Sequence, residues 1–436
     1  MDTRFIDHLA QLQQRTEQAL QATGFDGLLI GSGPQHKRFL DDTSYPFRAN
    51  PHFVQWLPFL TEQPDCWLLI KPGCKPTLLL YSPDDFWHMT PTLPNDWWSN
   101  SFDIHPYQNR AELVQALSEE SWLAVINEQP VDFTAEGWLH NPPALINQLN
   151  YQRAVKTEWE LECLRQANIT AVKGHLIAEQ LFKQGASEYQ IHQAYLGAIA
   201  HNERDMPYDN IVALNEHAAV LHYQFQQRNS PAEHRTLLID AGASHLGYAA
   251  DITRTFTPAG TLFADLVEAL DKAQQQLLSE VKAGVCFIGL HRRMHELVAD
   301  ILNRSGLVNG SIESIVESGI SRAFFPHGLG HLLGLQVHDV GGWQADLLGT
   351  EQAPPQQHPF LRLTRTLESG FVITVEPGLY FIPSLLEPLR NNSRRAEVNW
   401  ADVDRLMPWG GIRIEDNIAV TERGCENFTR DAFTSS

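Results

Sequence analysis

The chain has 436 residues, more than a single hydrophobic core usually fills, so we expect two domains. Its 52 acidic and 32 basic residues give a formal net charge of −20, which argues against a surface for nucleic acid or an anionic membrane. Five cysteines without a CxxC pair provide no cysteine zinc site and favour a reduced, cytoplasmic protein, and no apolar run approaches the ~18 residues that span a bilayer.

The first 153 residues have the pattern of a small α/β domain. The opening "MDTRFIDHLAQLQQRTEQAL" predicts an amphipathic helix and, because it contains acidic residues, not a signal peptide. Short apolar runs bounded by turn residues predict strands in "GLLIGSG", "CWLLIKPG", "TLLLYSP" and "WLAVINE". The aromatic stretch "SYPFRANPHFVQWLPF" has no clean period, which favours core or interface packing over a ligand pocket.

Residues 154–436 have the pattern of a second, α+β domain. Thr157 and Glu160 form a capping box before the long helical stretch "EWELECLRQANITAVKGHLIAEQLF", and Ser187 opens another helix. From Pro207 onward the sequence changes to strands and loops that suggest antiparallel pairing, with helical stretches near 262–282 and 288–304.

The stretch "FFPHGLGHLLGLQVHDVGG" places three histidines close together. His327 and His331 have the i,i+4 spacing of a helical metal pair, but Gly328 and Gly330 each cost a helix roughly 1 kcal/mol, and the Glu of an HExxH motif is missing. We therefore predict a glycine-rich loop or strand here, with a bend before His338.

Four carboxylates lie in apolar strand patterns. Asp240 and Asp251 belong to "LLIDAGASHLGYAADITRTF", Glu376 to "FVITVEPGLYF" and Glu415 to "GGIRIEDNIAV". A buried carboxylate is costly unless it is paired or bound to a cation, so four of them beside a histidine cluster suggest bound cations. An oxygen-rich site favours a hard or borderline ion such as Mn²⁺ over zinc held by thiolates.

In chain order, Asp240, Asp251, His331, Glu376 and Glu415 resemble the ligand set of the dinuclear pita-bread metallopeptidases, which include methionine aminopeptidase, aminopeptidase P and prolidase. The motifs "DAG…DITRTF", "HGLGHLLGLQVHD", "RTLESGFVITVEPGLYF" and "GIRIEDN" carry this resemblance over residues 155–436. The stretch "YPFRANPHF" resembles the creatinase-type N-terminal domain. The strongest likeness is to the bacterial Xaa-Pro dipeptidase group, which includes the organophosphorus acid anhydrolases.

This resemblance implies two divalent cations per chain, Mn²⁺ foremost, with Co²⁺ or Zn²⁺ as alternatives. Asp240 would chelate one ion, Asp251 and Glu415 would bridge both, and His331 and Glu376 would complete the second. The expected fold is a pita-bread catalytic domain preceded by a smaller α/β domain. The expected activity is hydrolysis of Xaa-Pro dipeptides by a hydroxide that bridges the ions.

The resemblance also assigns roles around the ions. Glu376 would shuttle protons, His338 would stabilise the oxyanion, and His222 would be a further catalytic histidine. The expected substrate-binding residues are Arg362, which would hold the proline carboxylate, His327, Tyr208 and Arg413, the last as a support for the bridging carboxylates. Phe287 stands where we place a second pocket tyrosine of the anhydrolase group.

Two other functions stay open from the sequence. Aminopeptidase P would accept longer Xaa-Pro peptides, and a non-catalytic binding module with this fold would be expected to lack several ligands, whereas all five stand here. Side activity on organophosphorus triesters is chemically reasonable, and related enzymes are commonly homodimers. The segment 383–411 is interpreted as a lid, an edge hairpin or a surface excursion.

Overall fold

The computed structural model describes residues 3–435 except 88, 90, 132, 134 and 136. The chain divides into two compact units. The first comprises Met1–Arg153, Thr157–Glu160 and Asp346–Thr350, and the second comprises Ala154–Lys156, Leu161–Ala345 and Glu351–Ser436. Within the described residues, every helix is too short or too polar to cross a membrane.

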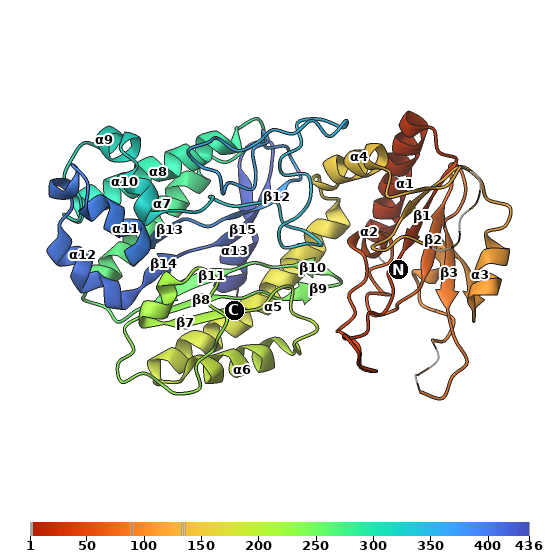
Figure 1. The fold of residues 1–436 in the computed structure, drawn as a ribbon, viewed down its shortest axis with the longest axis horizontal. Coiled ribbons are helices and arrows are strands. Elements are labelled where there is room, and N and C mark those ends of the chain that lie inside the picture. The colour runs from red at the N-terminus through yellow and green to blue at the C-terminus, as the bar shows by residue number, and fades with distance from the viewer. Residues whose placement is uncertain are drawn as a thin grey trace. The chain divides into compact units, whose positions relative to one another are not determined.

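The first unit is a six-stranded mixed sheet in the order β4-β3-β2-β1-β5-β6 (Figure 1). Its helices are α1 (Thr3–Thr23), α2 (Pro51–Trp56), α3 (Arg110–Ala116) and α4 (Pro143–Arg153), with a 3₁₀ turn η1 at Ser99–Ser101. Its strands are β1 (Gly27–Gly31), β2 (Trp67–Ile70), β3 (Thr77–Tyr81), β4 (Asp103–Tyr107), β5 (Leu123–Ile126) and β6 (Leu139–His140). The four strands predicted from apolar runs are confirmed as β1, β2, β3 and β5.

The aromatic stretch of the first unit is only partly core. Phe53 and Trp56 on α2 are buried, as the sequence predicts. Tyr45 is 54% exposed, and just before the stretch Phe39 and Leu40 are 89% and 91% exposed. Buried packing therefore accounts for the helical part of this stretch and not for the loop before it.

One half of the second unit packs two helices on a three-stranded antiparallel sheet. The helices α5 (Glu158–Lys183) and α6 (Glu188–Ile199) lie against the sheet β11-β8-β7, formed by Thr253–Phe256, Leu237–Asp240 and Ile211–Leu214 (Figure 1). A short hairpin, β9 (Ser244–His245) and β10 (Tyr248–Ala249), and the 3₁₀ turn η2 (Asn215–Ala219) complete this half. The capping box before α5 is confirmed: Glu160 accepts from the Thr157 backbone N–H at 2.8 Å, and the Thr157 hydroxyl accepts from the Glu160 backbone N–H at 3.3 Å.

The other half of the second unit packs helices on two further antiparallel sheets, β12-β15-β16 and β13-β14. The strands are β12 (Val372–Val375), β13 (Gly378–Tyr380), β14 (Gly411–Arg413), β15 (Asp416–Val420) and β16 (Cys425–Asn427). The helices are α7 (Leu262–Leu278), α8 (Phe287–Arg304), α9 (Ile312–Glu317), α10 (Ile320–Phe324), α11 (Pro383–Arg390), α12 (Trp400–Leu406) and α13 (Phe428–Thr434), with 3₁₀ turns η3 (Arg395–Glu397) and η4 (Met407–Trp409). Apolar side chains of α7 and α8 share one core with those of β12, β14 and β15.

Two expectations are wrong. The segment 383–411 is neither lid nor hairpin, because it forms α11, η3, α12 and η4 and buries Leu386, Val403 and Leu406 in the main core. Phe287 lies at the first position of α8 with no exposed surface, packed in the same core and not in a pocket.

Candidate metal centre

The four predicted carboxylate ligands lie at or beside the ends of strands, and the fifth ligand, His331, lies in a loop. Asp240 ends β8, Asp251 precedes β11, Glu376 follows β12, and Glu415 lies between β14 and β15. An isolated bridge between Thr253 and Glu415 joins the two halves of the unit at this point. Carboxylates distant in sequence are thus brought to one place by strand pairing.

The ligand atoms of three residues converge closely. One atom from each of Asp251, His331 and Glu415 lies within 4.8 Å of the other two, and all three side chains are buried. His331 Nε2 is 3.4 Å from Asp251 Oδ2 and 3.7 Å from Glu376 Oε1. The structure therefore brings together four of the five predicted ligands: Asp251, His331, Glu376 and Glu415.

His331 is held by a loop that runs beside β12. The Thr374 N–H donates to the His331 carbonyl at 3.0 Å, and the Glu376 N–H donates to the Leu329 carbonyl at 2.8 Å. A Cβ on Gly330 would collide with the Thr374 carbonyl, so this close approach requires glycine. The prediction of a glycine-rich loop, not a helical pair, is confirmed.

Hydrogen bonds fix which nitrogen of His331 is available. Nδ1 lies 2.9 Å from the Leu332 carbonyl and donates to it, which leaves the Nε2 lone pair facing Asp251 and Glu376. The backbone of Asp251 is fixed in turn by Asn417, whose side chain both accepts from its N–H and donates to its carbonyl.

Asp240 is connected to the other ligands through Arg413. The Arg413 guanidinium donates to Asp240 Oδ2 at 2.6 Å, to the Tyr380 hydroxyl at 3.0 Å and to Thr253 Oγ1 at 3.2 Å. Thr253 Oγ1 donates in turn to Glu415 Oε2 at 2.7 Å. Arg413 therefore orients two of the carboxylates, in keeping with its predicted supporting role.

The same network continues to His327. Its Nδ1 donates to the Gly328 carbonyl at 2.8 Å, so Nε2 accepts from the Tyr380 hydroxyl at 2.8 Å. Burial and the Arg413 charge lower the pKa of His327 to about 3, so this histidine is neutral. His327 Nδ1 also lies 3.7 Å from Glu376 Oε2, which places it beside the predicted proton shuttle.

The carboxylates carry more negative charge than their partners neutralise. Burial raises the pKa of Glu376 to about 7, and burial together with Asp251 and Glu376 raises the pKa of Glu415 well above its usual range. Burial also raises the pKa of Asp240 despite the Arg413 charge. Asp251 is the exception, because His331 outweighs the effect of burial and lowers its pKa.

These residues fit divalent cations. Among the described residues, the second carboxylate oxygen of Asp240, Oδ1, is buried without a hydrogen-bond partner. The buried Tyr208 hydroxyl also lacks a well-formed hydrogen bond there. Oxygen atoms dominate the donor set, with one imidazole nitrogen, as hard and borderline ions prefer. Bound cations would satisfy the orphan oxygen and offset the cost of burying four carboxylates.

The remaining predicted residues surround this centre more loosely. The His338 ring is perpendicular to His331 at a centroid distance of 4.5 Å, and partial burial with the charges of His331 and Arg362 lowers the pKa of His338 to about 4. His222 and Arg362 are exposed. The charge of His222 acts on both His327 and His338, and the charge of Arg362 acts on His338.

The loop that carries His338 is anchored by a buried ion pair. Lys156 Nζ lies 2.9 Å from Asp339 Oδ2, and both side chains are 1% exposed. The Asp339 N–H also donates to the Leu332 carbonyl at 2.9 Å, so the chain folds back between His331 and His338. This fold brings the two rings together.

Three residues of the site were not predicted as members of it. Thr253, Tyr380 and Asn417 connect the ligands by hydrogen bonds, as described above. Thr253 and Tyr380 stand inside the motifs "DITRTF" and "EPGLYF", so the motifs signal their importance, whereas their bonding partners come from strands distant in sequence.

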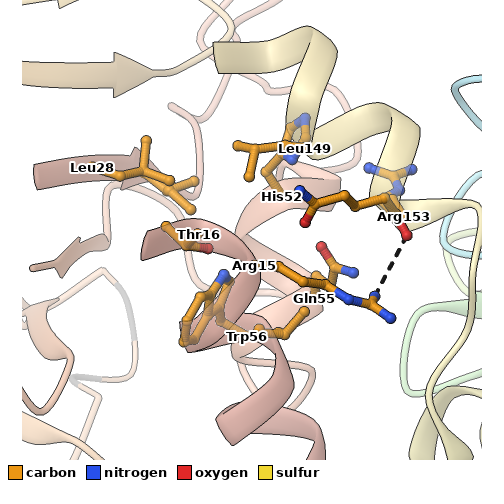
Figure 2. Close-up of a pocket in the computed structure, with 11 residues that line it drawn as sticks. Arg15, Thr16, Leu28, His52, Gln55, Trp56, Leu149 and Arg153 are labelled. Atoms are coloured by element: carbon orange, nitrogen blue, oxygen red, sulfur yellow. Dashed lines mark hydrogen bonds between the residues drawn. The ribbon is translucent and has the colours of Figure 1, made fainter. Parts of the chain in front are cut away.

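A separate cavity lies wholly within the first unit (Figure 2). It is lined by residues of α1, β1, α2 and α4, and the Arg15 guanidinium donates to the Gln152 carbonyl at 3.5 Å. None of the predicted site residues lines this cavity, so it has no part in the metal centre.

Comparisons with known proteins identify the family. The N-terminal domain of Xaa-Pro dipeptidase matches residues 3–151, and metallopeptidase family M24 matches residues 162–422. Xaa-Pro dipeptidases of Shewanella sp. (strain W3-18-1) and Aeromonas hydrophila are 46% and 47% identical, over 97% and 98% of both chains.

Solved structures of aminopeptidase P agree on the fold. The low-pH form of the Escherichia coli enzyme is 25% identical with a TM-score of 0.73, covering 96% of this chain and 95% of that one. Proline aminopeptidase P II from Yersinia pestis has a TM-score of 0.71 at 24% identity and covers 96% of both chains. The expected pita-bread fold with a smaller α/β domain is thus confirmed. The chain belongs to metallopeptidase family M24, with an N-terminal domain of the Xaa-Pro dipeptidase type.

Proposed function

We propose that this metallopeptidase hydrolyses Xaa-Pro dipeptides at the centre formed by Asp240, Asp251, His331, Glu376 and Glu415. The observation that carries the proposal is the convergence of four of these side chains, Asp251, His331, Glu376 and Glu415, in a chain 46% identical to enzymes named Xaa-Pro dipeptidase. The metal-binding and catalytic functions then belong to residues 154–436, and residues 1–153 form the accessory N-terminal domain.

The five side chains would hold two divalent cations. Asp240 would bind one, His331 Nε2 and Glu376 would bind the other, and Asp251 with Glu415 would be shared between them. When bound, the cations polarise a carbonyl and lower the pKa of water to the neutral range. Mn²⁺ is the metal we favour, because oxygen donors dominate the set; Co²⁺ and Zn²⁺ are the alternatives.

Glu376 is the residue we assign to proton transfer. Its carboxyl oxygens lie 3.7 Å from His331 Nε2 and from His327 Nδ1, and a pKa raised by burial suits a group that must both accept and donate a proton near neutral pH. It would take a proton from the attacking water and deliver it to the leaving prolyl nitrogen. Removal of the Glu376 carboxylate would then abolish both steps.

His338 and His222 would act on the substrate carbonyl. Both are exposed beside the centre, and the neutral His338 ring can present an N–H to the oxyanion that develops during attack. Tyr208 and His327 would line the pocket for the two residues of the substrate. Burial, together with the charges of Asp240, Asp251 and Glu415, raises the pKa of the Tyr208 hydroxyl well above its usual range and keeps it protonated as a donor.

Arg362 would distinguish a dipeptidase from aminopeptidase P, the enzyme whose solved structures this chain resembles in fold. Its exposed guanidinium acts on His338 by charge and could pair in a bidentate manner with a C-terminal carboxylate. A longer peptide has no carboxylate at that position. This arrangement would restrict cleavage to dipeptides.

The test is a cleavage panel of Xaa-Pro dipeptides, Xaa-Pro-Yaa tripeptides and a phosphotriester with Mn²⁺, Co²⁺ and Zn²⁺. We expect dipeptide cleavage that is strongest with Mn²⁺, with slower phosphotriester hydrolysis. Replacement of Arg362 by Ala should raise KM for dipeptides about 10-fold or more, whereas Arg395→Ala in η3 serves as a control. An unchanged KM with efficient tripeptide cleavage would instead assign aminopeptidase P.

We further propose a cytoplasmic homodimer. All five cysteines are free, as suits a reducing compartment. Large apolar side chains of the first unit, Phe39, Leu40, Phe86 and Trp87, are 77–91% exposed, which favours coverage by a second copy. Sedimentation equilibrium of the full chain tests this, with a monomer at micromolar concentration as the contrary result.

A further inference from the structure

A second group of metal-ligand side chains lies outside the carboxylate centre, on α8. His291 and His295 are one helical turn apart, and His358 approaches them from the loop that precedes Arg362. Ring nitrogens from all three lie within 4.8 Å of one another. The ring centroids are 4.7 Å apart for His291 and His295, and 4.3 Å and 4.7 Å from each of these to His358.

Among the residues that the structure describes, most of the buried nitrogens in this group find no hydrogen-bond partner. His291 is 1% exposed, and neither of its ring nitrogens is bonded; Nε2 of His295, also 1% exposed, is unbonded as well. A buried polar group without a partner costs about 1–3 kcal/mol, and native proteins rarely leave one so. One ring nitrogen from each of His291, His295 and His358 lies within 4.8 Å of the other two, and unbonded nitrogens on two of these rings indicate that something binds there.

The chemistry of the group selects a cation over an anion. Burial, and repulsion from neighbouring positive charges, lower the pKa of His291 to about 2, of His295 to about 3 and of His358 to about 4. All three rings are therefore neutral at pH 7 and each offers a lone pair, whereas an anion would need charged donors. Arg292 and Arg322 act on these rings, but Arg292 is exposed and its charge is screened by water.

His295 also has a partner that orients its ring. Its Nδ1 lies 3.2 Å from the Ser321 hydroxyl, which leaves Nε2 directed at the other two rings. A hydrogen bond on the far nitrogen is the usual support of a metal-bound histidine. His358 is half-buried, so the group has an opening to solvent through which an ion could enter.

We propose that His291, His295 and His358 bind a divalent cation of the class of Zn²⁺, separate from the carboxylate centre, with one coordination position open to solvent. Two imidazoles at helical i,i+4 spacing plus a third from a loop suit a four-coordinate borderline ion whose fourth position is open. Because one ring nitrogen of each histidine already lies within 4.8 Å of the other two, rotation of the side chains would complete the coordination geometry.

The position of this site suggests what the ion does. The Phe325 ring lies 4.9 Å from His295 and 5.0 Å from His327, and the backbone of Phe360 and Leu361 lies against Gly328. An ion on His358 would therefore fasten the 358–362 loop to α8, next to the turn that carries His327. Its role is to position this loop, so its loss should raise KM for the dipeptide more than it lowers kcat.

The experiment uses the full-length, metal-depleted protein and titrates it with Co²⁺ and then with Zn²⁺. We compare the wild type with His358→Ala and His295→Gln, and with His245→Gln as a matched control on β9. We expect the wild type and the control to show the visible absorption of four-coordinate Co²⁺ and to bind one more Zn²⁺ per chain than the two variants. Ser321→Ala should weaken Zn²⁺ binding roughly 10- to 100-fold.

The outcomes separate this site from the carboxylate centre. A fault in the dinuclear proposal would change the total number of bound ions equally in all four proteins and leave the difference of one ion intact. A wild type without the four-coordinate Co²⁺ spectrum, or a folded His358→Ala protein that binds as many Zn²⁺ ions as the wild type, would overturn the proposal. The half-buried position of His358 favours folding of that variant, which circular dichroism checks.

Discussion

His327 and His331 have the same spacing in the sequence as His291 and His295, yet the two pairs belong to different backbones and different chemistry. The first pair lies in a glycine-rich loop, and its two rings belong to different parts of one site: His331 faces the carboxylates, and His327 faces Tyr380. The second pair lies on α8, where both rings face one point. Spacing therefore predicts a common ligand only where the backbone is helical.

The surroundings of the two pairs differ in charge as well. His331 lies among carboxylates, which outweigh burial and raise its pKa. Burial lowers the pKa of His291 and His295, and the charges that add to this effect come from imidazole and guanidinium groups. The loop pair, His327 and His331, is thus suited to hard ions that also bind oxygen ligands. The helix pair, His291 and His295, is suited to a borderline ion held by nitrogen ligands alone.

The largest expected effect concerns Glu376, the acid beside the loop pair. Replacement by Gln would remove the proposed proton acceptor and a proposed metal ligand, so kcat for an Xaa-Pro dipeptide should fall about 10²- to 10⁴-fold. The exposed Glu317 at the end of α9 provides the control, Glu317→Gln, which should keep full activity. Steady-state kinetics with saturating Mn²⁺ measure both, and a Glu376→Gln enzyme within threefold of the wild type would remove Glu376 from the chemistry.

The next effect tests why the loop pair is not helical. In Gly330→Ala the new Cβ would strike the Thr374 carbonyl, which must move away from His331. We expect a loss of about 3 kcal/mol or more in the free energy of unfolding, together with weaker binding of metal at the carboxylate centre. Denaturant unfolding and metal analysis measure these quantities. A variant as stable as the wild type would show that this approach is not required.

The carboxylate centre could be predicted from the sequence because its motifs are local and specific. "DITRTF", "HGLGH" and "GIRIEDN" each place one ligand next to residues that orient it, such as Thr253 and Arg413. The hydrogen-bond network between these motifs could not be predicted, since it depends on which strands pair. The Arg413–Tyr380–His327 connection joins residues from β14, β13 and the loop before β12.

The helix pair was missed although its signal was available. The helix near 288–304 was predicted, and His291 and His295 stand within it at i,i+4 spacing. The third ligand, His358, comes from a loop without a regular period, so its arrival beside α8 follows from tertiary packing alone. The segment 383–411 was misjudged for a similar reason, because the buried contacts that stabilise its short helices are distant in sequence.

His175, a buried histidine that belongs to neither pair, gives a reference for the effect of burial. His175 on α5 donates from Nε2 to the Ala241 carbonyl at 3.0 Å, and burial lowers its pKa to about 3 despite this bond. Between pH 6.5 and 3 the unfolded chain binds the proton and the folded chain does not, so stability is complete above pH 6.5 and falls as the pH drops.

Because of His175, we expect the free energy of unfolding to fall by about 1.4 kcal/mol for each pH unit below 6.5. Denaturant unfolding at pH 7.5 and 5.5 should therefore show a smaller acid loss in His175→Gln than in the wild type. The exposed His105 on β4 supplies the control, His105→Gln, whose acid loss should equal that of the wild type. Equal pH dependence in all three proteins would contradict the assignment.

The smallest effect is the counterpart of Gly330→Ala on the helix pair. Gly289 lies near the start of α8, is exposed, and has nothing within 4 Å of the place where a Cβ would stand. Gly289→Ala should therefore stabilise the protein by about 0.5–1 kcal/mol, because alanine loses less backbone entropy in a helix. The same Gly→Ala change is thus made beside each histidine pair. If the free energy of unfolding falls in Gly330→Ala and rises in Gly289→Ala, the two pairs differ because of their backbone conformations. Destabilisation by Gly289→Ala would mean that α8 is also constrained near His291.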